Sequence, residues 1–162
     1  MGEYKNDKKH GAGYYKWKDG TAFEGTFKND WQDKGTKKYP DGVISTYEGV
    51  WTRYDTKFTG TVTYADGSIF EGEDRSGKLK GKLTYLDHRF EGLWETKKNR
   101  YMRTGVLYYD NGDRYEGSQY KKDGIWLKDG KGKMTTAGET VIGIWKDDEL
   151  VKEQKRTVNK TE

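Results

Sequence analysis

The strongest constraint in this sequence is an alternation of polar and apolar residues, interrupted by glycines at regular intervals. Residues 60–72 alternate, turn once around Gly67 and alternate again, which is typical of a β-hairpin. A two-residue loop would put Tyr64 and Phe70 on opposite faces. A three-residue loop closed by a left-handed glycine places Val62 opposite Phe70 and collects the apolar side chains on one face. The side-chain period of two therefore predicts the three-residue loop and a single apolar face.

The same unit recurs along the chain, and self-similarity of this kind indicates a repeat architecture. Glycines of the incoming strands stand at Gly13, Gly35, Gly60, Gly81, Gly105 and Gly132. Glycines of the outgoing strands, which we expect to be structural, stand at Gly25, Gly49, Gly72, Gly92, Gly117 and Gly143. In the first five copies the outgoing glycine ends an aromatic-Glu-Gly motif, and Val141 begins the degraded last copy. The pattern predicts about six antiparallel hairpins, each in contact with its neighbours.

These motifs resemble the MORN (membrane occupation and recognition nexus) repeat, in which Tyr/Phe-Glu-Gly-x-Trp precedes a basic loop, Gly-x-Gly and Tyr-x-Asp-Gly. The likeness covers about residues 2–147. It departs at Asp74 and Gln119, which stand at the tryptophan position, and at Thr136, at the tyrosine position. The resemblance implies an all-β fold, a single elongated stack of antiparallel β-hairpins. It also implies a scaffold function in cytoskeletal, ciliary (axonemal) or flagellar assemblies, or at the membrane–cytoskeleton boundary.

The predicted domain organisation is one repeat domain and one tail. The repeat domain is expected over residues 1–147, starting inside a repeat, and the charged tail over 148–162. Acidic residues precede basic ones across residues 147–156, which predicts a short C-terminal helix. Polar stretches between the hairpins predict loops, and the longest of these are 95–104 and 118–131.

The composition separates this chain from disordered and nucleic-acid-binding chains. It is 31% hydrophobic and 36% charged, a balance typical of disorder, but its 15% aromatic content suits a thin sheet. The 31 basic and 27 acidic residues are interspersed, so no nucleic-acid partner is expected. The lack of cysteine excludes disulfides and is compatible with a reducing compartment. We expect a location in the cytoplasm or cytoskeleton, with the cilium or flagellum among the settings that the resemblance implies.

No constellation in the sequence meets the requirements of catalysis, which needs a base, a nucleophile or a metal in convergent geometry. His10 and His88 stand in separate stretches, and we interpret both as structural. The glutamates of the aromatic-Glu-Gly motifs point away from the aromatic face by register and are expected to pair with lysines across the sheet. They are Glu24, Glu48, Glu71, Glu91 and Glu116. We therefore predict no enzyme activity, no metal site and no cofactor.

The aromatic residues at the repeat positions have two interpretations: packing between repeats, which we favour, or a ligand groove. Large residues outside the repeat pattern are more informative, because in a polar loop they either fold back or meet a partner. They are Trp31, Tyr54, Phe58, Tyr101, Met102, Ile125, Trp126 and Leu127. The candidate partner-binding residues among them are Trp126, Ile125, Leu127, Tyr101, Met102 and Trp31. The alternative for Trp126 is that it covers the aromatic face where Gln119 has replaced the expected tryptophan.

Two functions from different classes remain open. The first is a non-enzymatic protein–protein interaction scaffold, a rigid β-repeat subunit that binds other proteins of a larger assembly or self-associates through the ends of its stack. The second is a peripheral membrane module that binds acidic phosphoinositides. The lysines available to it are Lys8, Lys9, Lys37, Lys38, Lys78, Lys80, Lys82, Lys97 and Lys98. Acidic residues interrupt these lysines, so the sequence favours the scaffold over a lipid-binding surface.

Overall fold

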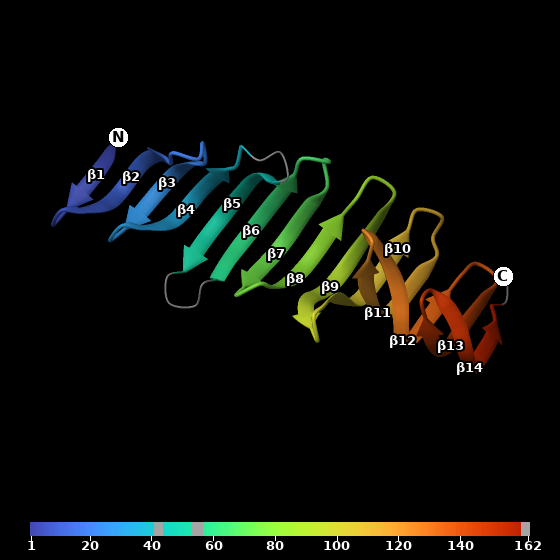
Figure 1. Cartoon of the computed structure of the whole chain (residues 1–162). Helices are drawn as coiled ribbons and strands as arrows, with labels where there is room; N and C mark the ends of the chain where they lie inside the picture. Colours follow the sequence, from blue (N-terminus) through green and yellow to red (C-terminus); the bar gives the residue numbers. More distant parts are fainter. Residues whose placement is uncertain (41–43, 53–56, 160–162) are drawn as a thin grey trace. The chain divides into compact units, whose positions relative to one another are not determined.

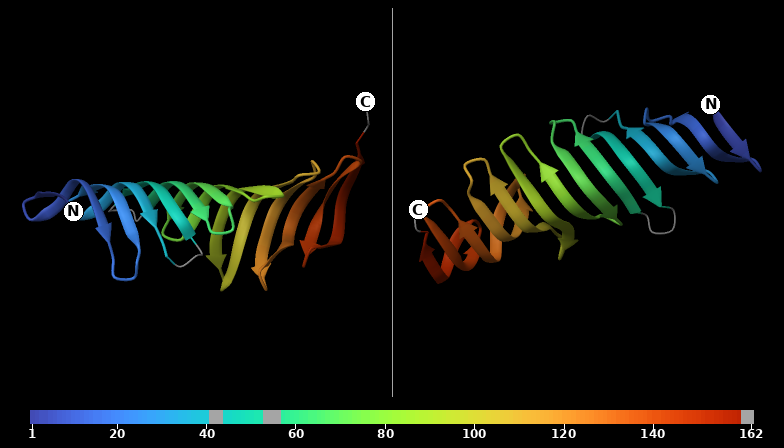
Figure 2. Two further views of the ribbon diagram at one scale, coloured as in Figure 1. Left: turned by 90° about the horizontal axis from the view of Figure 1, so that it is seen from above. Right: turned by 180° about the vertical axis from the view of Figure 1, so that it is seen from behind.

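A computed structural model describes residues 1–40, 44–52 and 57–159 of the chain. Within these ranges all regular secondary structure is β-strand, which confirms the all-β prediction. The chain divides into two compact units, Met1–Gly77 and Lys78–Glu162. In both units the strands follow one another in the sheet in chain order, and the neighbours pair antiparallel. Figure 2 shows the strands from above and from behind, with the turns at the ends of the strands.

Each unit is a row of hairpins that can be followed by its labels in Figure 1. The strands of the first unit are β1 (Gly2–Lys5), β2 (Lys8–Lys16), β3 (Ala22–Lys28), β4 (Trp31–Lys38), β5 (Ile44–Thr52), β6 (Lys57–Tyr64) and β7 (Ile69–Arg75). Those of the second are β8 (Lys78–Thr84), β9 (His88–Lys97), β10 (Arg100–Tyr109), β11 (Arg114–Lys122), β12 (Ile125–Thr135), β13 (Glu139–Lys146) and β14 (Glu149–Val158). Repetition of one hairpin therefore generates the β-sheet structure of both units.

The turn between β6 and β7 has the predicted three-residue form. The Tyr64 N–H donates to the Ser68 carbonyl at 2.9 Å, and the Gly67 N–H donates to the Tyr64 carbonyl at 3.1 Å. Gly67 has a φ of 85°, in the left-handed region that glycine occupies without strain. Val62 consequently faces Phe70 across the hairpin, and both side chains are 1% exposed. The prediction of one apolar face is confirmed for this hairpin.

The repeat glycines form a line across the strands of each unit, because the glycines of neighbouring strands pair with one another in register. The first unit has Gly2, Gly13, Gly25, Gly35, Gly49, Gly60 and Gly72 on this line, and the second has Gly81, Gly92, Gly105, Gly117, Gly132 and Gly143. A Cβ at Gly92 would lie 2.3 Å from the Thr104 carbonyl oxygen and 2.8 Å from the Gly105 Cα. The two backbones approach too closely there for any side chain.

The predicted long loops are strand extensions joined by tight turns, so this part of the prediction is wrong. Residues 95–104 continue β9 and β10 around a turn at Lys98 and Asn99, whose φ values are 49° and 60°. Residues 118–131 continue β11 and β12 around Asp123 and Gly124, also at positive φ. Two consecutive left-handed residues make the hairpin turn whose twist matches that of the flanking strands. A Lys-Asn pair carries little of the usual sequence signal for such a turn.

The predicted C-terminal helix is also wrong, because the segment forms β14 on the edge of the second sheet. β14 pairs antiparallel with β13, with Trp145 opposite Leu150 and Val141 opposite Arg156. The Arg156 guanidinium bonds Glu139 on β13 and Glu153 on its own strand. The sheet edge offers a full row of backbone hydrogen bonds, whereas the acidic-to-basic order supplies only a weak dipole interaction to an isolated helix.

Candidate functional site

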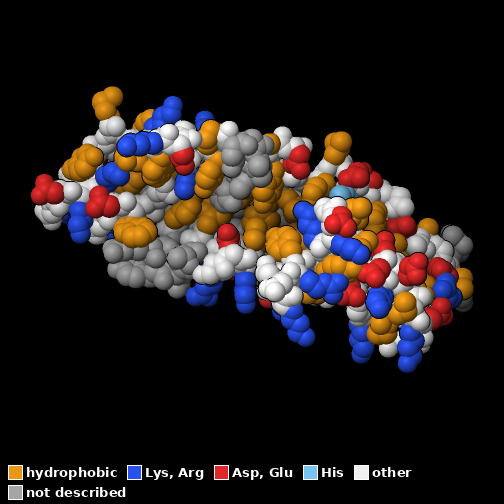
Figure 3. Space-filling view, in the orientation of Figure 1, with side chains coloured by type: hydrophobic (Ala, Val, Ile, Leu, Met, Phe, Trp, Pro, Cys, Tyr) orange, Lys and Arg blue, Asp and Glu red, His pale blue; other side chains and the backbone are white. Residues whose placement is uncertain are grey.

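One face of each sheet carries the large repeat side chains and is called the aromatic face here. Its buried members are Phe23, Phe27, Phe58, Val62 and Phe70 in the first unit, and Phe90, Trp94, Leu107, Tyr115 and Val141 in the second. Figure 3 shows hydrophobic side chains gathered over the strands, with lysine and arginine side chains projecting at the strand ends. A fully buried side chain of this size contributes about 1.5–3 kcal/mol. The aromatic face is therefore the source of stability in both units.

The rings of the aromatic face lean over the glycine line and pack on one another. Phe90 and Trp94 flank Gly92 on one strand, four residues apart, yet their ring centroids are only 4.8 Å apart. Phe23 on β3 contacts Trp51 on β5 at 5.4 Å, so the contacts also run from one hairpin to the next. Edge-to-face pairs at these separations are worth about 0.5–1.5 kcal/mol beyond the area they bury. These contacts support the packing interpretation of the repeat aromatics.

Cations from the strands lie against rings of the same face, both accessible and buried. The Lys9 Nζ is 3.9 Å from the Tyr15 ring centroid, and the Lys128 Nζ is about equally close to two rings, Tyr115 at 5.5 Å and Trp145 at 5.4 Å. Contacts of this kind contribute roughly 0.5–1 kcal/mol at exposed sites. The aromatic face is thus a surface of rings and cations, which is suited to recognition of another molecule.

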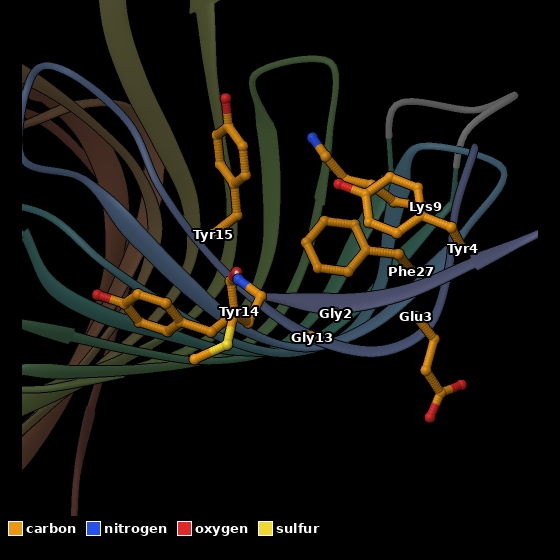
Figure 4. Close-up of a pocket in the computed structure, with 9 residues that line it drawn as sticks. Gly2, Glu3, Tyr4, Lys9, Gly13, Tyr14, Tyr15 and Phe27 are labelled. Carbon is orange, nitrogen blue, oxygen red and sulfur yellow. Dashed lines mark hydrogen bonds between the residues drawn. The ribbon is translucent and has the colours of Figure 1, made fainter. Parts of the chain in front are cut away.

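A small hollow of about 40 Å³ lies on the first unit between β1, β2 and β3 (Figure 4). Its lining includes Tyr4, Lys9, Tyr15 and Phe27. Figure 4 shows the Tyr15 and Tyr14 side chains leaving their strand in different directions. Tyr15 faces Phe23 in the register and belongs to the aromatic face, whereas Tyr14 faces Glu24. These neighbouring tyrosines therefore lie on opposite faces of the same strand.

The candidate partner-binding residues lie on strands and differ widely in exposure. Trp31 on β4 is 51% exposed, and Ile125 at the start of β12 is 63% exposed. Met102 on β10 and Leu127 on β12 are half-buried. Tyr54 lies outside the described residues. Phe58, which sequence reasoning placed in a loop, is 5% exposed and packs on Trp51 at 5.0 Å, so it folds back on its own sheet.

Trp126 and Tyr101 are brought together on the aromatic face of the second unit. Their ring centroids are 5.4 Å apart, and the Trp126 ring lies 4.4 Å from the Arg103 Cζ. Arg103 in turn bonds Gln119, the residue at the missing tryptophan position. Trp126 therefore covers this part of the face, as the alternative interpretation requires, while its half-buried ring stays partly accessible.

Arg103 is the functional candidate that sequence reasoning missed. It faces Trp94 on one side and Gln119 on the other, so its register position is inside the aromatic face. Burial lowers the pKa of Arg103 to about 10, which leaves the guanidinium charged at neutral pH. The available signal was the register itself, since counting in twos from Gly105 places Arg103 on the apolar side.

A second polar cluster lies near the ends of the same hairpins. Tyr120 is 5% exposed, and its hydroxyl donates a short hydrogen bond to Asp147. That bond raises the pKa of Tyr120. The Arg100 Cζ is 3.6 Å from the Tyr120 ring centroid, and the Arg100 guanidinium also contacts Asp129 at 3.5 Å. The cluster joins β10, β11 and β12 to the turn before β14, which stabilises the long hairpins.

The residues considered for catalysis do not converge in the described part of the chain. The His88 Nδ1 contacts Asp87 at 2.5 Å and its ring stacks on Tyr85, so its partners are local. Glu91 faces Lys82 and Glu116 faces Lys133 in the register, whereas Glu24 faces Tyr14 and Thr36. Among the described residues no group of three or more His, Cys, Asp or Glu side chains could hold a metal ion.

Several lysines of the membrane alternative are engaged within the sheet. Lys9 and Lys37 lie against rings, with the Lys37 Nζ 5.3 Å from the Trp17 ring. Lys78 and Lys97 both contact Glu95, at 3.8 Å and 2.5 Å. In the described ranges no helix is long and apolar enough to cross a membrane.

Comparison with known proteins identifies the repeat. The family model described as MORN repeat matches residues 1–22 and 23–44. The chain is similar to Alsin of Rattus norvegicus, Mus musculus and Homo sapiens, with 28% identity over 162 residues in each. These matches cover 91% of this chain but 8% of Alsin, so the chain spans a small part of the curated relatives' length. The MORN repeat is a non-catalytic module for interaction with proteins or membranes.

Proposed function

Because this chain belongs to the MORN-repeat family, we propose that it is a non-enzymatic scaffold whose aromatic face binds other proteins of a larger assembly. The proposed assembly is cytoskeletal, ciliary or membrane-associated, and the proposed location is the cytoplasm or cytoskeleton. The absence of cysteine from the sequence fits such a reducing compartment. Rigid β-repeat units suit this role, because each hairpin presents the same face to the partner.

The observation that carries the proposal is the mixture of buried and accessible rings on the aromatic face. Phe23 is fully buried, whereas Tyr15 beside it in the register is 37% exposed with a lysine against its ring. Tyrosine and tryptophan in such settings are the residue types most enriched among binding hot spots. The buried rings hold the sheet together and the accessible ones remain available to a partner.

The proposal is tested by capturing partners with the intact chain and with two tyrosine variants. Tyr15→Ala removes an accessible ring from the aromatic face. Tyr14→Ala removes a ring of 48% exposure from the other face of the same strand and serves as the matched control. We expect proteins captured by the wild type to be retained by Tyr14→Ala and lost with Tyr15→Ala. Equal retention by both variants would show that the aromatic face around Tyr15 does not bind the partner.

The membrane alternative predicts a different outcome that can be measured in parallel. The assay is co-sedimentation with anionic vesicles that contain about 5% phosphatidylinositol bisphosphate. If the lysines bind this lipid, co-sedimentation should weaken steeply as the salt concentration rises. We expect no salt-dependent sedimentation above that with neutral vesicles, because several of these lysines already contact rings or Glu95. Strong salt-sensitive sedimentation would favour the lipid-binding function instead.

A further inference from the structure

Arg103 lies inside the aromatic face with an unsatisfied hydrogen-bond donor. Only 2% of its surface is exposed. Its Nε donates to the Gln119 Oε1 at 2.9 Å, but its Nη1 is buried without a hydrogen-bond partner. Leaving a buried charged donor unpaired is destabilising, so such a group in a folded protein calls for an explanation. A ligand that completes the hydrogen bonds of the guanidinium is one such explanation.

The neighbours of the guanidinium favour its charge, and the Tyr85 hydroxyl also hydrogen-bonds it, but Nη1 has no hydrogen-bond partner. The Arg103 Cζ is 4.3 Å from the Phe90 ring centroid and 4.4 Å from the Trp126 ring centroid. Aromatic faces attract the cation electrostatically, but they accept no hydrogen bond in the plane of the guanidinium. The stacking therefore orients Arg103 and leaves the Nη1 edge for another acceptor.

An open cavity of about 320 Å³ adjoins Arg103 in the second unit. Leu107, Tyr109 and Trp126 give it apolar and aromatic walls. Asp87 and Asp148 also line it, but each carboxylate already has a cationic or imidazole partner. Asp87 bonds the ring of its neighbour His88 at 2.5 Å, and Asp148 bonds the Lys128 Nζ at 3.0 Å. Asp87 and Asp148 thus bond other residues and not Arg103.

The chemistry of the cavity selects a group with one negative charge. A guanidinium edge forms short, charge-assisted hydrogen bonds to a carboxylate. A phosphate dianion is less suited, because the charges of Asp87 and Asp148 would repel it in the same cavity. We propose that the cavity binds a carboxylate of a partner protein, from an acidic side chain or a chain terminus, through Arg103 Nη1, which rests on the interaction function proposed above.

Trp126 is the group that must move for the carboxylate to reach Arg103. Its half-buried indole lies over the guanidinium at the cavity wall, and the Nη1 of Arg103 is shielded from solvent. A change of the Trp126 side-chain rotamer would uncover the edge of the guanidinium and break the contact with the Tyr101 ring, whose centroid is 5.4 Å away. The bound carboxylate therefore replaces the Trp126 indole over Arg103, and the indole signal of Trp126 reports on this binding.

The test is a titration of the ¹⁵N-labelled chain followed through the arginine Nε–Hε signals. The probes are acetyl-Gly-Glu-Gly-amide, with a side-chain carboxylate, and acetyl-Gly-Leu, with a terminal carboxylate. Acetyl-Gly-Leu-amide is the uncharged control, and inorganic phosphate is the competing anion. Arg89 is the internal control, since its guanidinium also lies on a ring, Tyr108, but already bonds Glu91. Arg103→Lys assigns the Arg103 signal and removes the guanidinium edge.

We expect either carboxylate peptide to shift the Arg103 and Trp126 signals saturably, with half-saturation in the millimolar range of about 1–10 mM. The Arg89 signal should stay in place, and Arg103→Lys should weaken binding roughly tenfold or more. No shift of Arg103, equal shifts of Arg89, or the same effect from the amidated peptide would overturn the proposal. A stronger response to phosphate would overturn the choice of carboxylate. The wild-type titration decides the matter even if Arg103→Lys fails to fold.

The two proposals fail independently. If the peptides leave Arg103 unchanged while Tyr15→Ala still abolishes partner capture, the carboxylate site is wrong and the scaffold function stands. If the peptides bind but neither tyrosine variant affects capture, the cavity is a carboxylate site and the proposed role of the aromatic face around Tyr15 is wrong.

Discussion

Replacing Gly92 by alanine tests whether close backbone approach explains the glycine line. The added Cβ would lie 2.3 Å from the Thr104 carbonyl oxygen, 2.8 Å from the Gly105 Cα and 3.0 Å from the Phe90 ring. Two of these contacts are to backbone, which can yield only by separating β9 from β10. Overpacking of this kind costs about 1–3 kcal/mol. Loss of a ladder hydrogen bond adds about 0.5–1.5 kcal/mol.

Gly138→Ala is the matched control in the same unit. An added Cβ there meets nothing within 4 Å, and the backbone is not in the left-handed region. The substitution should therefore stabilise by about 0.4–1 kcal/mol, because alanine restricts the unfolded chain more than glycine does. The free energies of unfolding of the two variants should differ by about 2–4 kcal/mol.

Urea denaturation followed by tryptophan fluorescence measures this difference. With a slope of about 1.5 kcal/mol per molar urea, the midpoint of Gly92→Ala should lie roughly 1.5–2.5 M below that of Gly138→Ala. Both substitutions are in Lys78–Glu162, so a separate transition of the other unit affects them equally. Midpoints within about 0.3 M of each other would refute the steric account of the glycine line.

Three further predictions concern the turn at Gly67, the packing of Trp126 on the aromatic face and the Asp66 carboxylate. Gly67→Val should lower the melting temperature by several degrees and Gly67→Asn much less, since asparagine tolerates the left-handed φ of 85°; equal losses would contradict the turn. In urea denaturation, Trp126→Ala should lower the free energy of unfolding by about 1–3 kcal/mol, whereas replacing the exposed Ile125 by alanine should change it by no more than about 0.5 kcal/mol. The reverse order would argue against Trp126 as a cover of the aromatic face. Hydrogen bonds from Ser68 hold the pKa of Asp66 below its usual value, so this carboxylate stabilises the fold above its unfolded pKa and loses that effect as pH falls through the lower folded value. Ser68→Ala should raise the Asp66 pKa in an NMR titration, and an unchanged value would rule out this cause.

The sequence was sufficient to predict the strands and the faces of the hairpins, because alternation with a period of two is a local signal. The turn at Gly67 illustrates this, since only one loop length puts Val62 and Phe70 on the same face. The turns at Lys98-Asn99 and Asp123-Gly124 escaped detection for a physical reason. Asp-Gly is a common hairpin turn, but the polar residues around Asp123-Gly124 obscured the alternation that would have identified it, and Lys98-Asn99 carries little turn signal.

The remaining errors concern features that depend on partners distant in the chain. β14 forms because β13 offers it an edge, and the local order of charges carries no information about that edge. Arg103 was missed because its surroundings come from Phe90, Gln119 and Trp126 on three different strands. The candidate partner-binding residues were recognised as unusual from the sequence, but their exposure was set by strand register and could not be read from composition.

The affinity of the captured partner for three forms of the chain tests the proposed function most directly. Isothermal titration calorimetry would compare the wild type with Tyr15→Ala and Tyr14→Ala, the two faces of one strand. If the aromatic face is the binding surface, Tyr15→Ala should cost on the order of 2 kcal/mol, or roughly a 30-fold rise in Kd. Tyr14→Ala should leave Kd within about twofold. A loss of affinity confined to Tyr14→Ala, or none in either variant, would contradict the central claim.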